Sequence, residues 1–252
     1  MSRSRILSVA GGALIAATWL YLVLVRPTDW DEVGGSTEAI VTLVGYLGGA
    51  VLLLAGTIPH LPAAAIALIP AALVLNIVVG EVVGSVGVPL YLDAIGSALV
   101  AVLAGSRAGL ATGALSSIVW SLFNPTTLPF AAVSALIGWL IGLAHEHGFM
   151  RSLWRAIPTG LVIGLVSGAA AAPVAAFVYG GAAGVGAGAL VGLFREMGGS
   201  LLESVTLQSF ISDPIDKAIA LALAYAVVRA LPQRTLRALR PSEAGPGAGE
   251  GR

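Results

Sequence analysis

Acidic, amide and cationic side chains stand at the ends of several apolar runs of this 252-residue chain. Asp93 opens one run, Asn124 follows the next, and Asp216 with Lys217 opens the last. Ionisable groups at membrane depth are costly and often mark a substrate or ion pathway. A few such groups can orient a small polar ligand while apolar neighbours bury its body. We therefore predict a small-molecule site where these stretches meet.

The predicted substrate-binding residues are the polar and aromatic residues near these run ends, together with one amide inside the third run: Asn76, Tyr91, Asp93, Trp120, Asn124, Thr126, Asp216 and Lys217. Asn76 needs a partner at that depth, so it either joins two helices by a hydrogen bond or contacts the ligand. Trp120 can equally be an interfacial anchor. If variants of these residues leave ligand binding unchanged, the next candidates are Glu203 and Gln208 in the segment 180–212.

The start of the last run has two interpretations that do not exclude a binding role. Ser212 or Asp213 before Pro214 fits a helix N-cap with proline at the first helical position. Asp213 and Lys217 are four residues apart and can pair on one helix turn, whereas Asp216 is expected to face elsewhere.

Motifs of common enzymes are missing from the sequence. There is no Gly-x4-Gly-Lys-Ser/Thr loop for ATP and no Gly-x-Ser-x-Gly elbow. His145-Glu146-His147 lacks the spacing of a zinc protease and is interpreted as a solvated turn. The chain has no cysteine and therefore no thiol chemistry. We expect no catalysis, no cofactor, no metal and no nucleic-acid partner.

Composition indicates an all-α integral membrane protein, because 57% of the residues are hydrophobic and only 10% are charged. Eight apolar runs predict spans at 6–25, 37–57, 61–83, 92–105, 108–122, 127–144, 157–179 and 213–231. The polar end of the chain, rich in proline and glycine, predicts a disordered cytoplasmic tail over 236–252. The segment 180–212 is predicted to be a long structured external loop.

Arginine placement predicts the orientation. With eight spans, ten of the thirteen basic residues share one side: Arg3, Arg5, Arg107, Arg151, Arg155, Arg229, Arg234, Arg237, Arg240 and Arg252. The positive-inside rule makes that side cytoplasmic. We therefore expect a multi-pass protein of the cell membrane with both termini in the cytoplasm.

Three sets of small residues recur at spacing four, which places each set on one helix face. The two glycine sets, Gly105-x3-Gly109-x3-Gly113 and Gly160-x3-Gly164-x3-Gly168, are interpreted as packing surfaces within the bundle. The alanine set, Ala63-x3-Ala67-x3-Ala71, serves either packing or partner docking.

The sequence from about 61 to 235 resembles the substrate-specific S components of energy-coupling factor (ECF) vitamin transporters. The resemblance rests on the alanine set and four motifs: Leu-Asn76-Ile-Val-Val-Gly, Tyr91-Leu-Asp93-Ala-Ile-Gly96-Ser, Asn124-Pro-Thr-Thr-Leu-Pro129-Phe and Ser212-Asp213-Pro-Ile-Asp216-Lys217. It implies a six-helix substrate-binding core over 61–235, preceded by a two-helix extension over 1–60. It also implies a vitamin held near the outer surface. It also implies that Ala63, Ala67 and Ala71 dock onto a transmembrane coupling subunit driven by ATPase subunits. The extension 1–60 and the Gly105-Ser-Arg107 turn, where related sequences often read Gly-Pro, depart from the family pattern.

Two other classes of protein stay open. A self-sufficient facilitator or secondary carrier would be favoured by charged residues buried in mid-membrane, which we do not expect here. A non-transporting sensor or scaffold domain would be favoured by an attached cytoplasmic signalling domain. The substrate itself is not identified by the sequence.

Overall fold

The computed structural model describes residues 2–27, 36–181 and 184–239, and these ranges contain helices and no strand. Five of the described helical segments are long and apolar enough to cross a membrane: Arg3–Val25, Thr37–His60, Ala63–Ser85, Pro125–Glu146 and Leu153–Val178. The predicted all-α membrane class is therefore confirmed at this level, and the helices fit a multi-pass protein.

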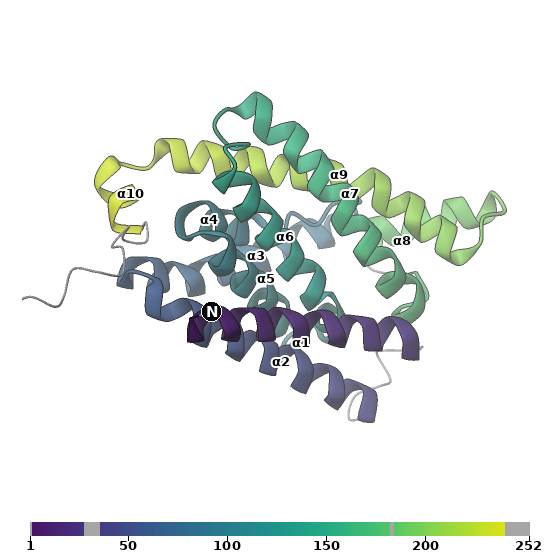
Figure 1. Ribbon diagram of the computed structural model, residues 1–252. Coiled ribbons are helices and arrows are strands. Elements are labelled where there is room, and N and C mark those ends of the chain that lie inside the picture. The colour runs from purple at the N-terminus through teal and green to yellow at the C-terminus, as the bar shows by residue number, and fades with distance from the viewer. Residues whose placement is uncertain (1, 28–35, 182–183, 240–252) are drawn as a thin grey trace, which may run out of the picture.

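Twelve helical elements follow one another along the described chain (Figure 1). They are α1 (Arg3–Val25), α2 (Thr37–Thr57), η2 (Ile58–His60), α3 (Ala63–Ser85), α4 (Ile95–Ala104), α5 (Ser106–Trp120), η3 (Pro125–Phe130), α6 (Ala131–Glu146), α7 (Leu153–Val178), α8 (Val185–Glu196), α9 (Leu201–Ala230) and α10 (Gln233–Leu239). The spans expected at 6–25 and 37–57 agree with α1 and α2, because each is one uninterrupted apolar run.

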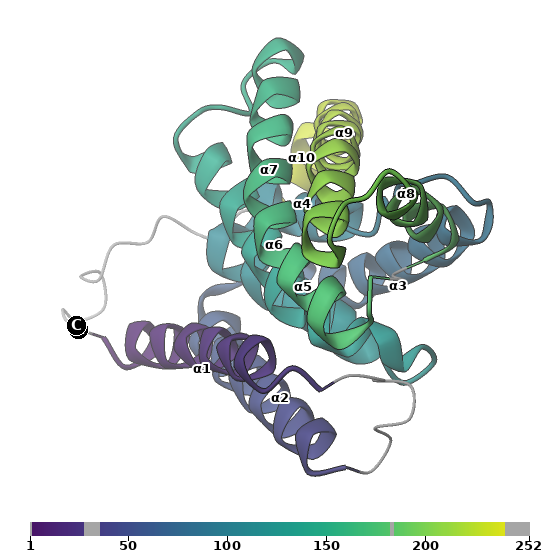
Figure 2. The same cartoon turned by 90° about the vertical axis from the view of Figure 1, so that its right-hand side faces the viewer.

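Helices α1 and α2 form a hairpin beside the rest of the bundle (Figure 2). The hairpin packs on α5, α6 and α7 rather than on α3. Two hydrogen bonds attach it: Trp19 Nε1 donates to the Ala170 carbonyl at 3.1 Å, and the Tyr46 hydroxyl donates to the Pro129 carbonyl at 3.2 Å. The N-terminal extension is therefore docked on the core while one side of α3 stays uncovered.

Helices α7 and α9 cross along the glycine set of α7 (Figure 1). A methyl group added to Gly164 would lie 2.4 Å from the Asp213 carbonyl oxygen, and one added to Gly160 would lie 2.5 Å from the Ala218 Cα. The other glycine set behaves alike, because a methyl group on Gly113 would meet the Ser134 carbonyl of α6 at 2.0 Å. The α7 set and the pair Gly109 and Gly113 are packing surfaces, as predicted, and they let backbones approach closely. Gly105 instead joins α4 to α5 at a φ of 95°, where a methyl group would meet nothing closer than 3.7 Å.

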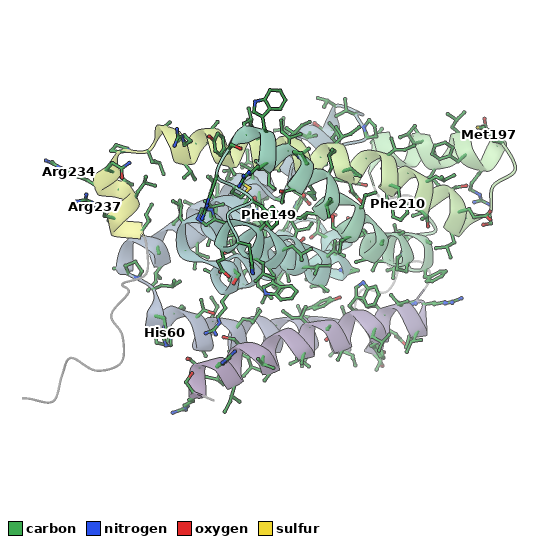
Figure 3. All side chains as sticks on the ribbon, turned by 45° about the horizontal axis from the view of Figure 1, so that its top comes forward. His60, Phe149, Met197, Phe210, Arg234 and Arg237 are labelled. Atoms are coloured by element: carbon green, nitrogen blue, oxygen red, sulfur yellow. The ribbon has the colours of Figure 1, made fainter. Side chains whose placement is uncertain are left out.

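One end of the molecule gathers α10, the start of α3 and the start of α1. Leu239 packs with Ala65 in one hydrophobic cluster, and Ser4 Oγ lies 3.4 Å from His60 Nε2. Figure 3 places His60, Arg234 and Arg237 toward this end and Met197 at the opposite one. The end that carries Arg234 and Arg237, called the basic end below, and the α8–α9 turn thus lie on opposite sides of the bundle.

The last long helix begins earlier than predicted. Helix α9 starts at Leu201, with Ser200 and Glu203 forming a capping box, so the expected N-cap at Ser212 or Asp213 is wrong. Pro214 lies inside the helix. The expected loop 180–212 accordingly contains α8 and the first turns of α9.

Two smaller corrections concern the predicted boundaries. The fourth span was expected from residue 92, but α4 starts at Ile95, which leaves Asp93 in the preceding loop. The tail was expected to be disordered from residue 236, but α10 continues to Leu239, and residues 240–252 lie outside the described part.

Candidate functional site

A cavity of about 380 Å³ lies among α3, α5, α6, α7, α9 and the loop before α4. Six of the eight predicted substrate-binding residues line it: Tyr91, Asp93, Trp120, Asn124, Thr126 and Lys217. Their side chains come from three separate stretches of the chain, 91–93, 120–126 and the middle of α9. The structure thus brings together most of the residues that the sequence singled out at the ends of apolar runs.

A buried charge cluster forms one wall of this cavity. Lys217 is 3% exposed, and its Nζ donates to Asp216 Oδ2 at 2.5 Å and to Asp93 Oδ1 at 3.3 Å. The expected pairing of Lys217 with Asp213 is therefore not what the structure shows. The loop before α4 instead brings Asp93 to the lysine, and Asp216 completes the pair of carboxylates.

Asp216 does not line the cavity, but it binds the loop before α4, which forms part of the cavity wall. It is fully buried, and its Oδ1 accepts the backbone N–H groups of Tyr91 at 2.8 Å and Leu92 at 2.6 Å. Leu92 has a φ of 49°, a left-handed conformation that is uncommon for a residue other than glycine. The carboxylate therefore holds a loop conformation that positions Tyr91 and Asp93.

Glu81 forms a second polar group on the α3 side of the cavity. Its Oε1 accepts Trp120 Nε1 at 2.5 Å and lies 3.5 Å from Asn124 Nδ2. The Trp120 ring lies against Gly80, where a methyl group would meet it at 2.3 Å. Glu81 was not among the residues predicted from the sequence, although it is the single acid in the run 61–85. That signal could have placed it in the site.

The η3 segment is tied to the end of α7. Asn124 Oδ1 accepts the Thr126 hydroxyl at 2.5 Å, and the Thr126 carbonyl accepts the Tyr179 hydroxyl. The Phe130 and Tyr179 rings stack at 5.6 Å between centroids. Tyr179 was missed by sequence reasoning, because nothing local ties it to η3. It adds an aromatic wall to the cavity.

Helix α9 contributes two buried polar side chains that lack a hydrogen-bond or ion-pair partner among the described residues. Gln208 is 4% exposed and lines the cavity, and its Nε2 has no hydrogen-bond partner. Asp213 is 7% exposed, lines the same cavity, and makes no hydrogen bond or ion pair there. Buried polar groups normally have partners, so both are available to a ligand. Glu203, the other fallback residue, serves instead as the helix cap.

Asn76 does not line the cavity. It is fully buried and joins three helices, since Nδ2 donates to Ser97 Oγ at 2.8 Å and to Ser116 Oγ at 3.2 Å, and Oδ1 accepts the Gly96 N–H at 2.6 Å. Of its two predicted roles, the interhelical hydrogen bond is the one that the structure contains.

A larger cavity, of about 510 Å³, lies between α1 and the faces of α5, α6 and α7. Its lining is apolar apart from a few residues that include Arg5, Ser8 and Arg107. Such walls suit hydrocarbon and offer little to orient a polar ligand. The smaller cavity, where the polar groups converge, is therefore the better candidate for a small-molecule site.

The alanine set lies on an uncovered side of α3. Ala63, Ala67 and Ala71 are all exposed, and so are Val74 and Val78 farther along the helix. The N-terminal hairpin packs elsewhere, so it does not cover this surface. A row of methyl groups of this kind permits close approach of another helix.

Comparisons of the chain with protein-family models, with curated proteins and with solved structures found no match. The described residues place hydrogen-bonding groups, charges and aromatic rings around one cavity, and this combination is typical of small-molecule sites.

Proposed function

We propose that this chain is the substrate-capturing subunit of an ECF-type importer. It binds a small, vitamin-like solute at the outer face of the cell membrane and releases it inward when partner ATPases act through a transmembrane coupling subunit. The chain itself carries out no catalysis.

The observation that carries this proposal is the cavity of about 380 Å³, which is lined by the last residues of α3, whereas α10 packs near the start of that helix. Four stretches far apart in sequence line it, and each contributes a polar side chain: Glu81, Asp93, Asn124 and Lys217. A volume in this range suits one small molecule, and convergent polar groups suit its recognition.

The uncovered alanine face of α3 supports the partner half of the proposal. Ala63, Ala67 and Ala71 are exposed, and no other helix of the described chain occupies that side. The resemblance to S components assigns docking on the coupling subunit to the same three residues. The open face and the resemblance therefore favour the same assignment.

Charge distribution supports the proposed orientation. The basic residues that the sequence predicts to be cytoplasmic include Arg234 and Arg237, which lie on the side of the bundle opposite Met197 (Figure 3). With the basic end in the cytoplasm, the cavity faces outward, as a capture subunit requires.

A secondary carrier is the second candidate, and one observation favours it. Asp213, Asp216 and Lys217 are buried midway along the 30-residue α9, although the sequence led us to expect no such charges. Buried ionisable groups of this kind serve as ion relays in carriers. In the present arrangement, Asp216 and Lys217 also support the cavity wall, which agrees equally with a binding subunit.

Reconstitution separates the two candidates. The full chain is placed in liposomes alone, or together with ECF coupling and ATPase subunits, and uptake of the solute that co-purifies with it in native mass spectrometry is measured. The importer proposal expects uptake that requires both the partner subunits and ATP. Uptake by the chain alone, driven by an ion gradient, would establish the carrier instead.

A further inference from the structure

We infer that the cavity takes an organic cation, a molecule that presents a protonated amine or quaternary ammonium group beside an aromatic or apolar body. This inference rests on the proposed function, because it names the chemical class of the captured solute.

Carboxylates outnumber cations in the lining. Glu81, Asp93 and Asp213 line the cavity, and Lys217 is the single basic residue among the described lining residues. Lys217 is already bound to Asp93 and to Asp216 behind it. Its charge is therefore satisfied, while Glu81 and Asp213 are left without a cationic partner within 4.0 Å in the described chain.

A buried carboxylate without a partner is costly to maintain. Asp213 is held between α7 and α9, and its Oδ2 would lie 2.9 Å from a methyl group on Gly168. Its carboxylate is packed against α7 on that side and lines the cavity, so a counter-charge has to come from what occupies the cavity. A ligand ammonium group supplies the missing counter-charge and donates hydrogen bonds, which no anion or neutral hydrocarbon does.

Aromatic rings complete a cation site. Tyr91, Trp120, Phe130 and Tyr179 all line the cavity. Ring faces attract cations, and quaternary ammonium groups are commonly bound in aromatic surroundings of this kind. The same rings would bury an aromatic ligand body by stacking.

Gln208 offers one more hydrogen bond to a ligand that carries an acceptor. The residue lines the cavity, and its Nε2 is a donor without a partner among the described residues. A hydroxyl, a carbonyl or a ring nitrogen on the ligand would therefore strengthen binding, while the cationic group remains the feature that the site selects.

Three probes of similar size and different charge test the inference. 2-Phenylethylamine is cationic at neutral pH, 2-phenylethanol is neutral and phenylacetate is anionic. Binding of each to the purified full chain is measured by isothermal titration calorimetry. We expect the amine to bind at least tenfold more tightly than the other two. Equal affinities, tighter binding of phenylacetate or no measurable binding of the amine would overturn the inference.

Variants identify the carboxylates responsible. Asp213→Asn and Glu81→Gln each remove one negative charge, and we expect either to weaken amine binding about tenfold to a hundredfold while phenylethanol binding changes little. Glu196→Gln is the matched control, because Glu196 is exposed on α8 outside the cavity. Glu81 is exposed, so its variant is expected to fold even if the buried Asp213 variant does not. Unchanged amine binding in Glu81→Gln and in any Asp213→Asn that folds would also reject the inference.

The two proposals fail in different experiments. Amine binding without any ATP-dependent uptake in the reconstituted complex would leave the cation site standing and reject the importer. ATP-dependent uptake of a co-purified anion or neutral solute would leave the importer standing and reject the cation site.

Discussion

Lys217 Nζ lies 3.3 Å from Asp93 Oδ1, and this contact ties the middle of α9 to the loop before α4. Asp216 adds a second contact with the lysine at 2.5 Å and accepts two N–H groups from the same loop. One rim of the cavity is thus held by a cation and two carboxylates from segments 124 residues apart. The stability of the fold and the shape of the site depend on the same few atoms.

Removing the lysine charge should be costly. Lys217→Met leaves Asp216 buried without its cation, and we expect the free energy of unfolding to fall by about 3–5 kcal/mol. Thermal unfolding of the purified protein in detergent measures this. The double variant Asp216→Asn/Lys217→Met should recover part of the loss, because no unpaired charge is left buried. A wild-type midpoint for Lys217→Met would show that the cluster adds nothing to stability.

Substitution of Asn76 should lower the free energy of unfolding and leave ligand affinity unchanged. Asn76→Leu removes hydrogen bonds to Ser97 and Ser116 and leaves the buried Gly96 N–H unpaired, so we expect a loss of about 1–3 kcal/mol. Ser116→Ala removes only the 3.2 Å bond and should cost less. Calorimetry measures the ligand affinity of the folded Asn76→Leu protein. We expect this affinity to stay within about twofold of wild type, which is a smaller change in binding free energy than the 1.4 kcal/mol of a tenfold change. A larger loss of affinity would return Asn76 to the binding site.

The α7–α9 contact can be tested with matched glycine variants. Gly164→Ala places a methyl group 2.3 Å from the Pro214 Cα, and backbone on both sides cannot yield cheaply, so the unfolding temperature should fall clearly. Gly192→Ala on α8 meets nothing within 4 Å and should be neutral or stabilising by roughly 0.5–1 kcal/mol. Similar thermal shifts for both variants would argue against close packing at this crossing.

The sequence indicated most of the helices because each long apolar run is a strong and local signal. The predicted start of α9 was wrong because 200–212 is amphipathic and because proline is common at the first position of a helix, as Pro214 was expected to be. The capping box formed by Ser200 and Glu203 was present in the sequence and would have given the right boundary.

The site was predicted in part for a related reason. Residues at the ends of apolar runs, such as Asp93 and Asn124, were recognisable as polar groups at a common membrane edge. The partners of Lys217 were not, since spacing along one helix favoured Asp213, whereas tertiary folding supplies Asp93. Tyr179 depends on a contact with Thr126 that is 53 residues away in sequence. Such pairings arise only when the helices are assembled.

Orientation can be measured in this cysteine-free chain. Single cysteines replace Ser2, Ser106 and Ser152 at the basic end, and Thr126 and Met197 at the cavity end. With both termini inside, a membrane-impermeant thiol reagent added to intact cells should label only the cysteines at 126 and 197. Gly35, another suitable external position, lies outside the described residues. Labelling at 106 would overturn this topology.

The alanine face of α3 offers the sharpest test of partner docking. Ala67→Trp puts a bulky ring in the middle of the exposed methyl row, so close helix approach is blocked, and we expect co-purified coupling subunit to fall at least tenfold. Val162→Trp is the control, because Val162 is also exposed but lies on α7. Calorimetric ligand binding should be unchanged in both variants, since neither residue lines the cavity. If Ala67→Trp lost ligand binding and kept the coupling subunit, the face would belong to the binding site instead of the docking surface.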